Sequence, residues 1–321
     1  MHFLIRLLKE WTLPIAMISG TLAYFAFHYL SILNPIKPAI WYFVDNVTPL
    51  LIFLQLFLTF CKVEIPELKP QKWHFRLLAF QILASLAITA ALLLLPMNPT
   101  YHTIFEGALV CLICPTATAA AVITDRLGGS ASRVTSYTLL SNLMAALLVP
   151  ILFPLVQPQA GTNFLAACWL ILSKVLPLLL FPFLLAVLVR RYLPGLHKQL
   201  LKYTPSAFYL WAIALTLVCG QTVRSLHQSS APSSVMWCIA LVALGCCALQ
   251  FLIGKKTGSQ FDDRMTAGQA LGQKNTILAI WMAYSYLTPL SSLAPGTYVL
   301  WQNIFNGYQL WKKDKGAKSK S

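Results

Sequence analysis

Charge is scarce in this chain, and negative charge is scarcest. Lys, Arg, Asp and Glu make up 10% of the 321 residues, whereas they make up roughly a quarter of an ordinary soluble domain. Only nine residues are Asp or Glu, against 24 that are Lys or Arg. Hydrophobic residues make up 58% of the chain. This composition excludes a soluble globular domain and predicts a protein that lies in a membrane.

Motifs of metal-dependent and nucleophilic enzymes are absent as well. The sequence has no His-Glu-x-x-His motif and no serine within Gly-x-Ser-x-Gly. The eight cysteines fall in or beside apolar segments, without the two spaced pairs of a zinc site. We expect most of them to be buried as small apolar side chains. We therefore predict no enzymatic activity, no cofactor and no metal centre.

Apolar segments fill the chain. Each is about 20 residues long, which is enough for a helix that crosses the hydrocarbon core of a bilayer. The segments lie near residues 11–33, 40–60, 77–95, 104–124, 134–156, 164–189, 207–226, 235–253, 265–287 and 294–311. They predict an all-α polytopic membrane protein with ten transmembrane helices, in which residues 1–321 form a single transmembrane unit.

Basic residues lie mostly on one side of these spans. Of the 24 Lys and Arg residues, 20 precede the first span, follow the last, or lie in the connections after even-numbered spans. Because cytoplasmic loops hold the excess of Lys and Arg, we expect both termini in the cytoplasm and the protein in the plasma or bacterial inner membrane. The basic cytoplasmic tail, residues 312–321, is expected to contact anionic lipid and not nucleic acid.

Polar residues interrupt two of the spans. In the ninth, the stretch Gly268-Gln269-Ala270-Leu271-Gly272-Gln273-Lys274-Asn275 contains a charged lysine. In the fourth, the interruption reads Cys114-Pro115-Thr116-Ala117-Thr118. A polar break inside lipid is tolerated only where it is buried in protein or lines a cavity. A charge there indicates a functional site, and two broken spans in corresponding places are typical of a secondary transporter.

Ten spans divide into two sets of five. Because five crossings end on the opposite side of the membrane from where they began, the second set has the opposite orientation to the first. We therefore predict one five-helix repeat over residues 1–156 and an inverted repeat over residues 157–311. The fourth and ninth helices then cross, with breaks at Pro115 and Gly272. Proline removes a backbone donor, and helix ends bring partial charges to the crossing. Such a crossing suits an ion or an anionic substrate.

Three segments share a pattern with a known family: Glu106 through Cys114-Pro115 to Pro150, Gly272 to Ala279, and Tyr298 to Asn303. They resemble the bile acid:sodium symporter family of secondary transporters. The resemblance implies ten helices in two inverted repeats, with a panel domain and with a core domain that contains the crossed, broken helices. It also implies organic anions and related acids as substrates, carried together with sodium.

Several sodium ligands that the resemblance implies are missing. At the first break the family reads Cys-Pro-Gly-Gly-Thr-Ala-Ser-Asn, and this chain has Ala120 and Ala121 in place of the Ser and Asn. At the second it reads Glu-x-Gly-x-Gln-Asn, and this chain has Ala270 and Lys274 in place of the Glu and Gln. An ammonium among the ligands would repel sodium. We therefore expect this protein not to use the sodium sites of its relatives.

Lys274 is the centre of the predicted site. We expect its ammonium to occupy the place of a sodium ion and to donate to Gln81, Thr138 or exposed carbonyls. A lysine that titrates during the cycle would couple transport to protons, whereas a permanent charge favours uniport or exchange. The alternative is a structural role, in which Lys274 snorkels or forms a static pair. The candidate substrate- or ion-binding residues are Gln81, Thr116, Thr118, Thr138, Ser141, Gln269, Gln273, Lys274 and Asn275.

The predicted function is secondary transport of a small organic anion by alternating access. A cation or proton exchanger is an alternative, although such proteins usually need acids at mid-membrane and both breaks lack one. A nontransporting membrane receptor also stays open. We expect Glu106, near the outer side, to be solvated, and leave Asp45 open between solvation and a pair with Lys274. The sequence indicates neither the substrate's identity nor an oligomeric state.

Overall fold

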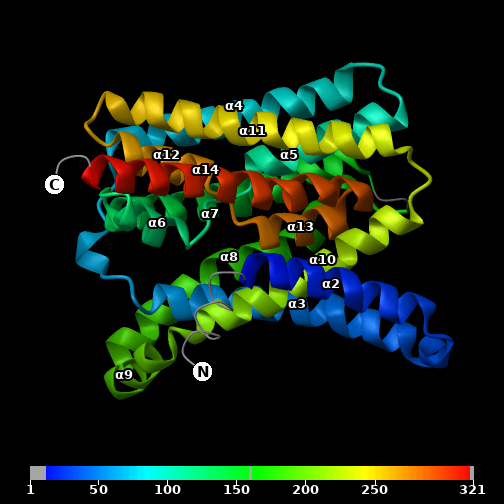
Figure 1. The fold of residues 1–321 in the computed structure, drawn as a ribbon, viewed down its shortest axis with the longest axis horizontal. Coiled ribbons are helices and arrows are strands. Elements are labelled where there is room, and N and C mark those ends of the chain that lie inside the picture. Colours follow the sequence, from blue (N-terminus) through cyan, green and yellow to red (C-terminus); the bar gives the residue numbers. More distant parts are fainter. Residues whose placement is uncertain (1–11, 159–160, 319–321) are drawn as a thin grey trace. The chain divides into compact units, whose positions relative to one another are not determined.

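A computed structural model describes residues 12–158 and 161–318. These residues are largely helical, and Figure 1 shows their arrangement. Residue 11 of the first predicted span and residues 319–321 of the basic tail lie outside the described part. Six described segments are long and apolar enough to cross a membrane: 34–60, 72–94, 131–156, 164–192, 206–228 and 233–259. The all-helical class with several spans is confirmed, and the count of ten spans in an inverted repeat remains a prediction.

The other four predicted spans take two forms. Two are single helices, α2 (Thr12–Tyr29) and α14 (Leu293–Lys318). The fourth predicted span consists of α5 (Pro99–Ile113) and α6 (Ala120–Arg126). The ninth consists of α12 (Arg264–Gly272) and α13 (Thr276–Tyr286). Each of these two predicted spans is therefore interrupted in the structure.

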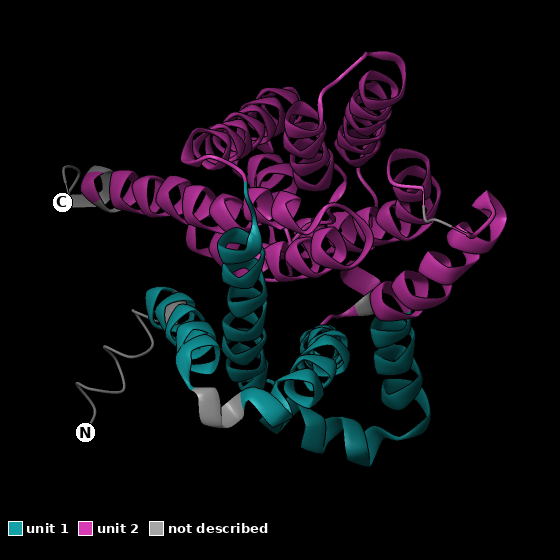
Figure 2. Ribbon diagram, turned by 90° about the vertical axis from the view of Figure 1, so that its right-hand side faces the viewer, with its two compact units in different colours: residues 1–62, 181–230 teal, residues 63–180, 231–321 magenta. Residues whose placement is uncertain are grey.

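The chain divides into two compact units, shown in different colours in Figure 2. Unit 1 comprises residues 1–62 and 181–230, and unit 2 comprises residues 63–180 and 231–321. Each unit combines segments from both halves of the sequence, so the units are a different division from the predicted repeats, which follow the chain. All four half-helices belong to unit 2. This agrees with the core domain that the family resemblance implies.

Unit 1 is built on α10, which packs against α2 and α3. Its elements are α2, η1 (Ser31–Ile36), α3 (Lys37–Phe60), the end of α8 (Phe164–Tyr192), α9 (Pro194–Tyr203) and α10 (Ser206–Gln228). The helix α9 lies between the sixth and seventh predicted spans and was not predicted. Asp45 on α3 is exposed and accepts a hydrogen bond from Gln221 Nε2 at 2.7 Å. Its partner is therefore an amide of the same unit.

Unit 2 is built around α11, which packs against α12, α14 and α5. Its other elements are η2 (Ile65–Glu67), α4 (Lys72–Leu94), α6, α7 (Ala131–Val156), the first part of α8, α13 and η3 (Pro289–Ser292), with α11 spanning Ser233–Ser259. The helices α11 and α14 run side by side (Figure 1). The helix α4 packs against both α5 and α7. The half-helices are thus enclosed by longer helices of the same unit.

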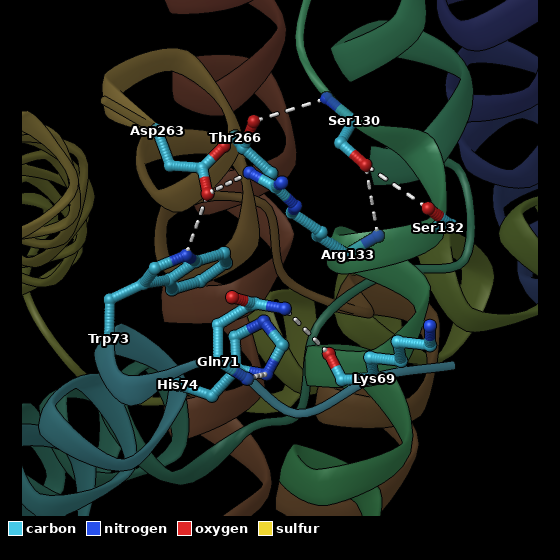
Figure 3. Close-up of polar contacts among 9 residues, drawn as sticks. All are labelled: Lys69, Gln71, Trp73, His74, Ser130, Ser132, Arg133, Asp263 and Thr266. Atoms are coloured by element: carbon cyan, nitrogen blue, oxygen red, sulfur yellow. Dashed lines mark hydrogen bonds and ion pairs between the residues drawn. The ribbon is translucent and has the colours of Figure 1, made fainter. Parts of the chain in front are cut away.

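A polar network ties together the ends of α4, α7 and α12 (Figure 3). Trp73 Nε1 donates to Asp263 Oδ2 at 3.0 Å, and Arg133 forms an ion pair with the same oxygen. The amide of Ser130 donates to Thr266 Oγ1 at 3.1 Å. Asp263 is buried, and a buried carboxylate needs such partners to offset its loss of water. The network therefore holds α12 at the end from which it runs to the second break.

Close contact between α11 and α12 predicts the effect of a single methyl group. A Cβ on Gly254 would lie 2.5 Å from the carbonyl oxygen of Ala267 and 2.9 Å from Gly268 Cα. These are backbone atoms, so Gly254→Ala must push the two helices apart. We expect it to lower the free energy of unfolding by about 1–3 kcal/mol, measured by thermal unfolding in detergent. Gly245→Ala is the control, because nothing lies within 4 Å of that position; equal melting temperatures for the two variants would contradict the packing.

Candidate functional site

The two helix breaks lie against each other and pair through their backbones. Thr116 and Lys274 form an isolated antiparallel bridge. Two hydrogen bonds complete the pairing, from Ala117 N to Gln273 O at 3.0 Å and from Asn275 N to Pro115 O at 2.9 Å. An interrupted helix leaves such groups without partners, and lipid offers none. Each break therefore supplies the hydrogen bonds that the other needs.

Local sequence explains where α5 stops and where α13 begins. The helix α5 ends two residues before Pro115, because proline lacks a donor and disfavours helical geometry in the residue before it. The helix α12 ends at Gly272, where a Cβ would lie 2.4 Å from the Phe251 ring. The helix α13 then begins at a cap, since Asn275 Oδ1 accepts from Leu278 N at 3.3 Å. The predicted residue Asn275 thus has a structural role in the break.

Three predicted site residues gather around the first break. Thr116 Oγ1 donates to the carbonyl of Ala270 at 2.6 Å. Ser141 Oγ accepts from the amide of Thr116 at 3.1 Å. Gln81 Nε2 donates to the carbonyl of Cys114 at 2.8 Å. Side chains of α4 and α7 therefore bind the unwound backbone directly.

Residues that are not among the predicted site residues surround the second break, although Tyr298 and Gln302 lie in a segment that carries the family resemblance. The amide of Lys274 donates to Gln302 Oε1 at 2.9 Å. Tyr298 OH donates to the carbonyl of Gly272 at 2.8 Å, and Gln250 Nε2 donates to Tyr298 OH at 3.1 Å. Gln250 and Gln302 are glutamines within apolar spans, and the same feature identified Gln81 as a candidate. It is a weak signal without knowledge of which helix faces the break.

The side chain of Lys274 is enclosed at this crossing. It is 2% exposed, and Nζ has no hydrogen-bond partner within the described residues. The groups that interact with it electrostatically are thiols of α5 and α11: Cys111, Cys114, Cys246 and Cys247. The C-terminal ends of α5 and α12 also meet here, and their partial negative charge favours a cation. The crossing therefore holds an amine that ordinary hydrogen bonds do not satisfy.

The predicted hydrogen bonds of the Lys274 ammonium were wrong. The Gln81 amide donates to the first break instead, and its Oε1 accepts from Tyr137 OH at 3.0 Å. Thr138 Oγ1 donates to the carbonyl of Val134 at 3.0 Å, within its own helix. Both side chains have partners that the sequence could not identify, because the rotation of α4 and α7 about their axes decides which neighbour each one meets.

The remaining predicted residues are distributed around the crossing. Gln269 Nε2 donates to Asn306 Oδ1 of α14 at 3.1 Å. Gln273 is buried, and within the described residues neither Gln269 Oε1 nor Gln273 Oε1 has a hydrogen-bond partner. Thr118 is half-buried in the first break. The second break therefore contains two buried amide oxygens as well as the lysine.

Residues 49–229 match the model of the Sodium Bile acid symporter family, and this match covers more than half of the chain. The chain belongs to this family. A relative, the "Uncharacterized sodium-dependent transporter YocS" of Bacillus subtilis (strain 168), is 22% identical over 229 residues, which are 66% of this chain and 67% of the relative. The symporter family and the relative are both transporters, so this chain is a multi-pass membrane transporter and not an enzyme.

The residues that match the family model, 49–229, include the first break and end before the second. Ala120 and Ala270 replace two residues that the sequence resemblance implied as sodium ligands. Both are fully buried in one apolar cluster. The cluster also contains Trp73, Leu77, Val134, Tyr137, Ala267 and Leu271. The residues present there do not fit a sodium ion, which requires oxygen ligands.

Glu106 of this transporter is fully buried, contrary to the prediction that it is solvated. Its Oε2 accepts from the amide of Thr288 at 3.1 Å. His102 Nδ1 lies 3.4 Å from its Oε1. The four-residue spacing of His102 and Glu106 was a signal for this pair, because such residues share a helix face. The acid is buried because the segment after α13 covers that face.

The described residues of the transporter also form a cavity away from the crossing. It has a volume of about 620 Å³ and lies at the N-terminal ends of α7 and α12. Its lining includes Ser130, Arg133, Asp263 and Thr266, which belong to the network of Figure 3. The Ser130 backbone amide bonds to Thr266, and Arg133 pairs with Asp263. None of the predicted site residues is part of this lining.

The hydrogen bond from Thr116 Oγ1 to the carbonyl of Ala270 predicts the effect of Thr116→Val. Valine keeps the shape of threonine but leaves the buried carbonyl of Ala270 without its donor. We expect the free energy of unfolding to fall by about 1–2 kcal/mol, measured by thermal unfolding in detergent. Thr135→Val is the matched control, because Thr135 Oγ1 donates only within α7, to Ala131 O at 2.9 Å. A loss as large in the control would show that the bond between the breaks is unimportant.

Proposed function

We propose that this protein moves a small organic anion across the plasma membrane by alternating access, with the Lys274 ammonium as the group that attracts the anion. Transport does not use the sodium sites of the family and is coupled to protons through Lys274. The proposal includes two inverted repeats, residues 1–156 and 157–311, and a basic tail, residues 312–321, with both termini in the cytoplasm. The observation that carries it is the buried amine at the crossing of two broken helices, which has no hydrogen-bond partner in the part of the chain that the structure describes.

Charge at the crossing supports an anionic substrate. The groups that interact with the Lys274 ammonium are thiols, and no carboxylate within the described residues is among them. A buried charge needs an opposite charge or several hydrogen bonds. A carboxylate of the substrate supplies both, because each of its oxygens accepts bonds from an ammonium. The buried amide groups of Gln269 and Gln273 offer further polar contacts nearby.

The apolar surroundings of Ala120 and Ala270 support the absence of sodium coupling. A transporter without a coupling cation still needs a driving force for uptake. Lysine can provide one, because its amine can bind a proton and release it again. Protonated Lys274 binds the anion on one side of the membrane, and loss of the proton on the other side releases it. One proton and one anion then move together.

The absence of a sodium site predicts a null result in a binding measurement. An ion present at about 100 times its Kd stabilises the folded state by about 2.7 kcal/mol. We expect sodium to give no such stabilisation over potassium, in thermal unfolding of the purified protein at constant ionic strength and several pH values. Saturable stabilisation by sodium would contradict the proposal, since it would require ligands other than the missing ones.

Replacement of Lys274 tests the role of its charge. In Lys274→Gln the family's amide is restored while Ala121 and Ala270 remain, so we expect uptake to fall by about 10- to 100-fold and sodium not to restore it. The measurement is uptake of a panel of radiolabelled small carboxylates into proteoliposomes with an imposed pH gradient, with and without sodium. Lys174→Gln is the control, because Lys174 lies exposed on α8 and its loss should leave uptake unchanged. Sodium-driven uptake by Lys274→Gln would refute the argument from lost ligands.

A further inference from the structure

A second buried ionisable group lies on α5, two turns before the first break. Glu106 is 0% exposed. Its Oε2 accepts a hydrogen bond from the amide of Thr288 at 3.1 Å. Within the described residues Oε1 has no hydrogen-bond partner. A buried carboxylate with one bare oxygen is costly, and a proton on that oxygen removes the charge.

A route for that proton is present in the structure. His102 lies one turn earlier on α5, with Nδ1 3.4 Å from Glu106 Oε1 and with 27% of its side chain exposed. Histidine is the side chain whose charge changes most readily near neutral pH. His102 is thus in contact with both the solvent-accessible surface and the buried carboxyl. It can pass a proton from water to Oε1 without exposing Glu106.

The other oxygen of Glu106 connects this acid to the second broken span. Thr288 lies two residues after the end of α13, and α13 begins at the break that contains Lys274. The bond from Thr288 to Glu106 therefore joins the two half-helices, α5 and α13, that lead away from the crossing. The same part of α5 also packs closely against the start of α14, since a Cβ on Gly107 would lie 2.7 Å from Ala294 Cβ. A hydrogen bond to a carboxylate is roughly twice as strong as one to a neutral group, so protonation of Glu106 weakens this connection.

Neighbouring helices add no competing charge. The elements packed against α5 are α4, α7, α11, α13, α14 and η3. Within the described residues, no charged side chain of these elements interacts with Glu106. On α13, the titratable residue closest in sequence to Thr288 is Tyr286. Its buried hydroxyl has no hydrogen-bond partner in the described part of the chain. The state of Glu106 therefore depends on His102 and Thr288.

We propose that Glu106 is a proton-binding site, loaded through His102, whose protonation weakens the bond to Thr288 and frees α13 from α5. The proposal rests on the proposed proton-coupled transport and adds a second proton site to it, on the same half-helix arrangement as Lys274. The proton that binds Glu106 comes from water and adds to Oε1, and the bond that weakens is the one between Oε2 and the Thr288 amide.

Infrared spectroscopy of the full chain in lipid nanodiscs tests proton binding directly. The titration runs from roughly pH 9 to pH 4, which spans ordinary carboxyl and histidine titration. The difference spectrum of wild type minus Glu106→Gln should contain the C=O band of a poorly hydrated carboxylic acid. The exposed Glu67→Gln should not remove that band. In His102→Gln the band should persist with a shifted midpoint. An identical spectrum for Glu106→Gln and wild type, or an unshifted midpoint in His102→Gln, would overturn the proposal.

Amide hydrogen exchange tests the connection to α13. Exchange in the peptide that contains residues 287–292, corrected for the intrinsic pH dependence, should rise by about tenfold as Glu106 becomes protonated. Glu106→Gln retains an acceptor for the Thr288 amide but no charge, so its corrected exchange should stay at the higher level at every pH. A pH-dependent rise of the same size in Glu106→Gln would mean that another group controls this segment.

These measurements need no substrate, so their failure differs from failure of the proposed function. Anion uptake that depends on Lys274, without an infrared signal from Glu106, would overturn the second proton site and leave transport intact. A Glu106 signal in a protein that takes up none of the carboxylates would support the proton site and contradict the transport proposal. If Glu106→Gln does not fold, the midpoint in His102→Gln decides the first test.

Discussion

Backbone hydrogen bonding between the two breaks is the constraint on which the rest of unit 2 depends. A chain that unwinds inside lipid must find partners for its amides and carbonyls within the protein. Here the bridge between Thr116 and Lys274 and its flanking bonds supply them. Neither break is stable alone, so the fourth and ninth predicted spans must form together. The Gln81, Ser141 and Gln302 side chains then bond to backbone groups of the breaks that the pairing leaves without a partner.

The same constraint explains why a lysine can lie at the crossing. Interrupted helices end here, and the carbonyl ends of α5 and α12 provide partial negative charge. In the pattern that the family resemblance implies, an acidic side chain accompanies a sodium ion. This chain instead combines a fixed ammonium at position 274 with alanine at positions 120 and 270, which are packed among apolar side chains. The substitutions form a coherent set, because loss of an acid and gain of a base both disfavour a metal cation and favour an anion.

Unit 2 contains two buried ionisable groups, Glu106 on the half-helix α5 and Lys274 in the break between α12 and α13. Eight residues of helix separate Glu106 from Cys114, about 12 Å along the axis. Each group lacks some of the hydrogen bonds that a buried charge normally has. One lies at the crossing and the other at the junction of α5 with the segment after α13. Under the two proposals, a change of protonation at either group acts on the half-helices that lead away from the crossing.

The sequence by itself determined the class of the protein and the positions of its breaks. The length of a hydrophobic run identifies a membrane span. Pro115, Gly272 and Lys274 indicate that a helix is interrupted whichever neighbours they contact, because their effects are local to the chain. Only the tertiary structure decided which side chains meet. The rotation of α4 directs Gln81 to a carbonyl and not to the lysine, and the segment after α13 buries Glu106, which its position in the sequence had suggested was solvated. Helix rotation and the covering of one helix by a distant segment depend on contacts across the whole unit, and a one-dimensional pattern does not contain them.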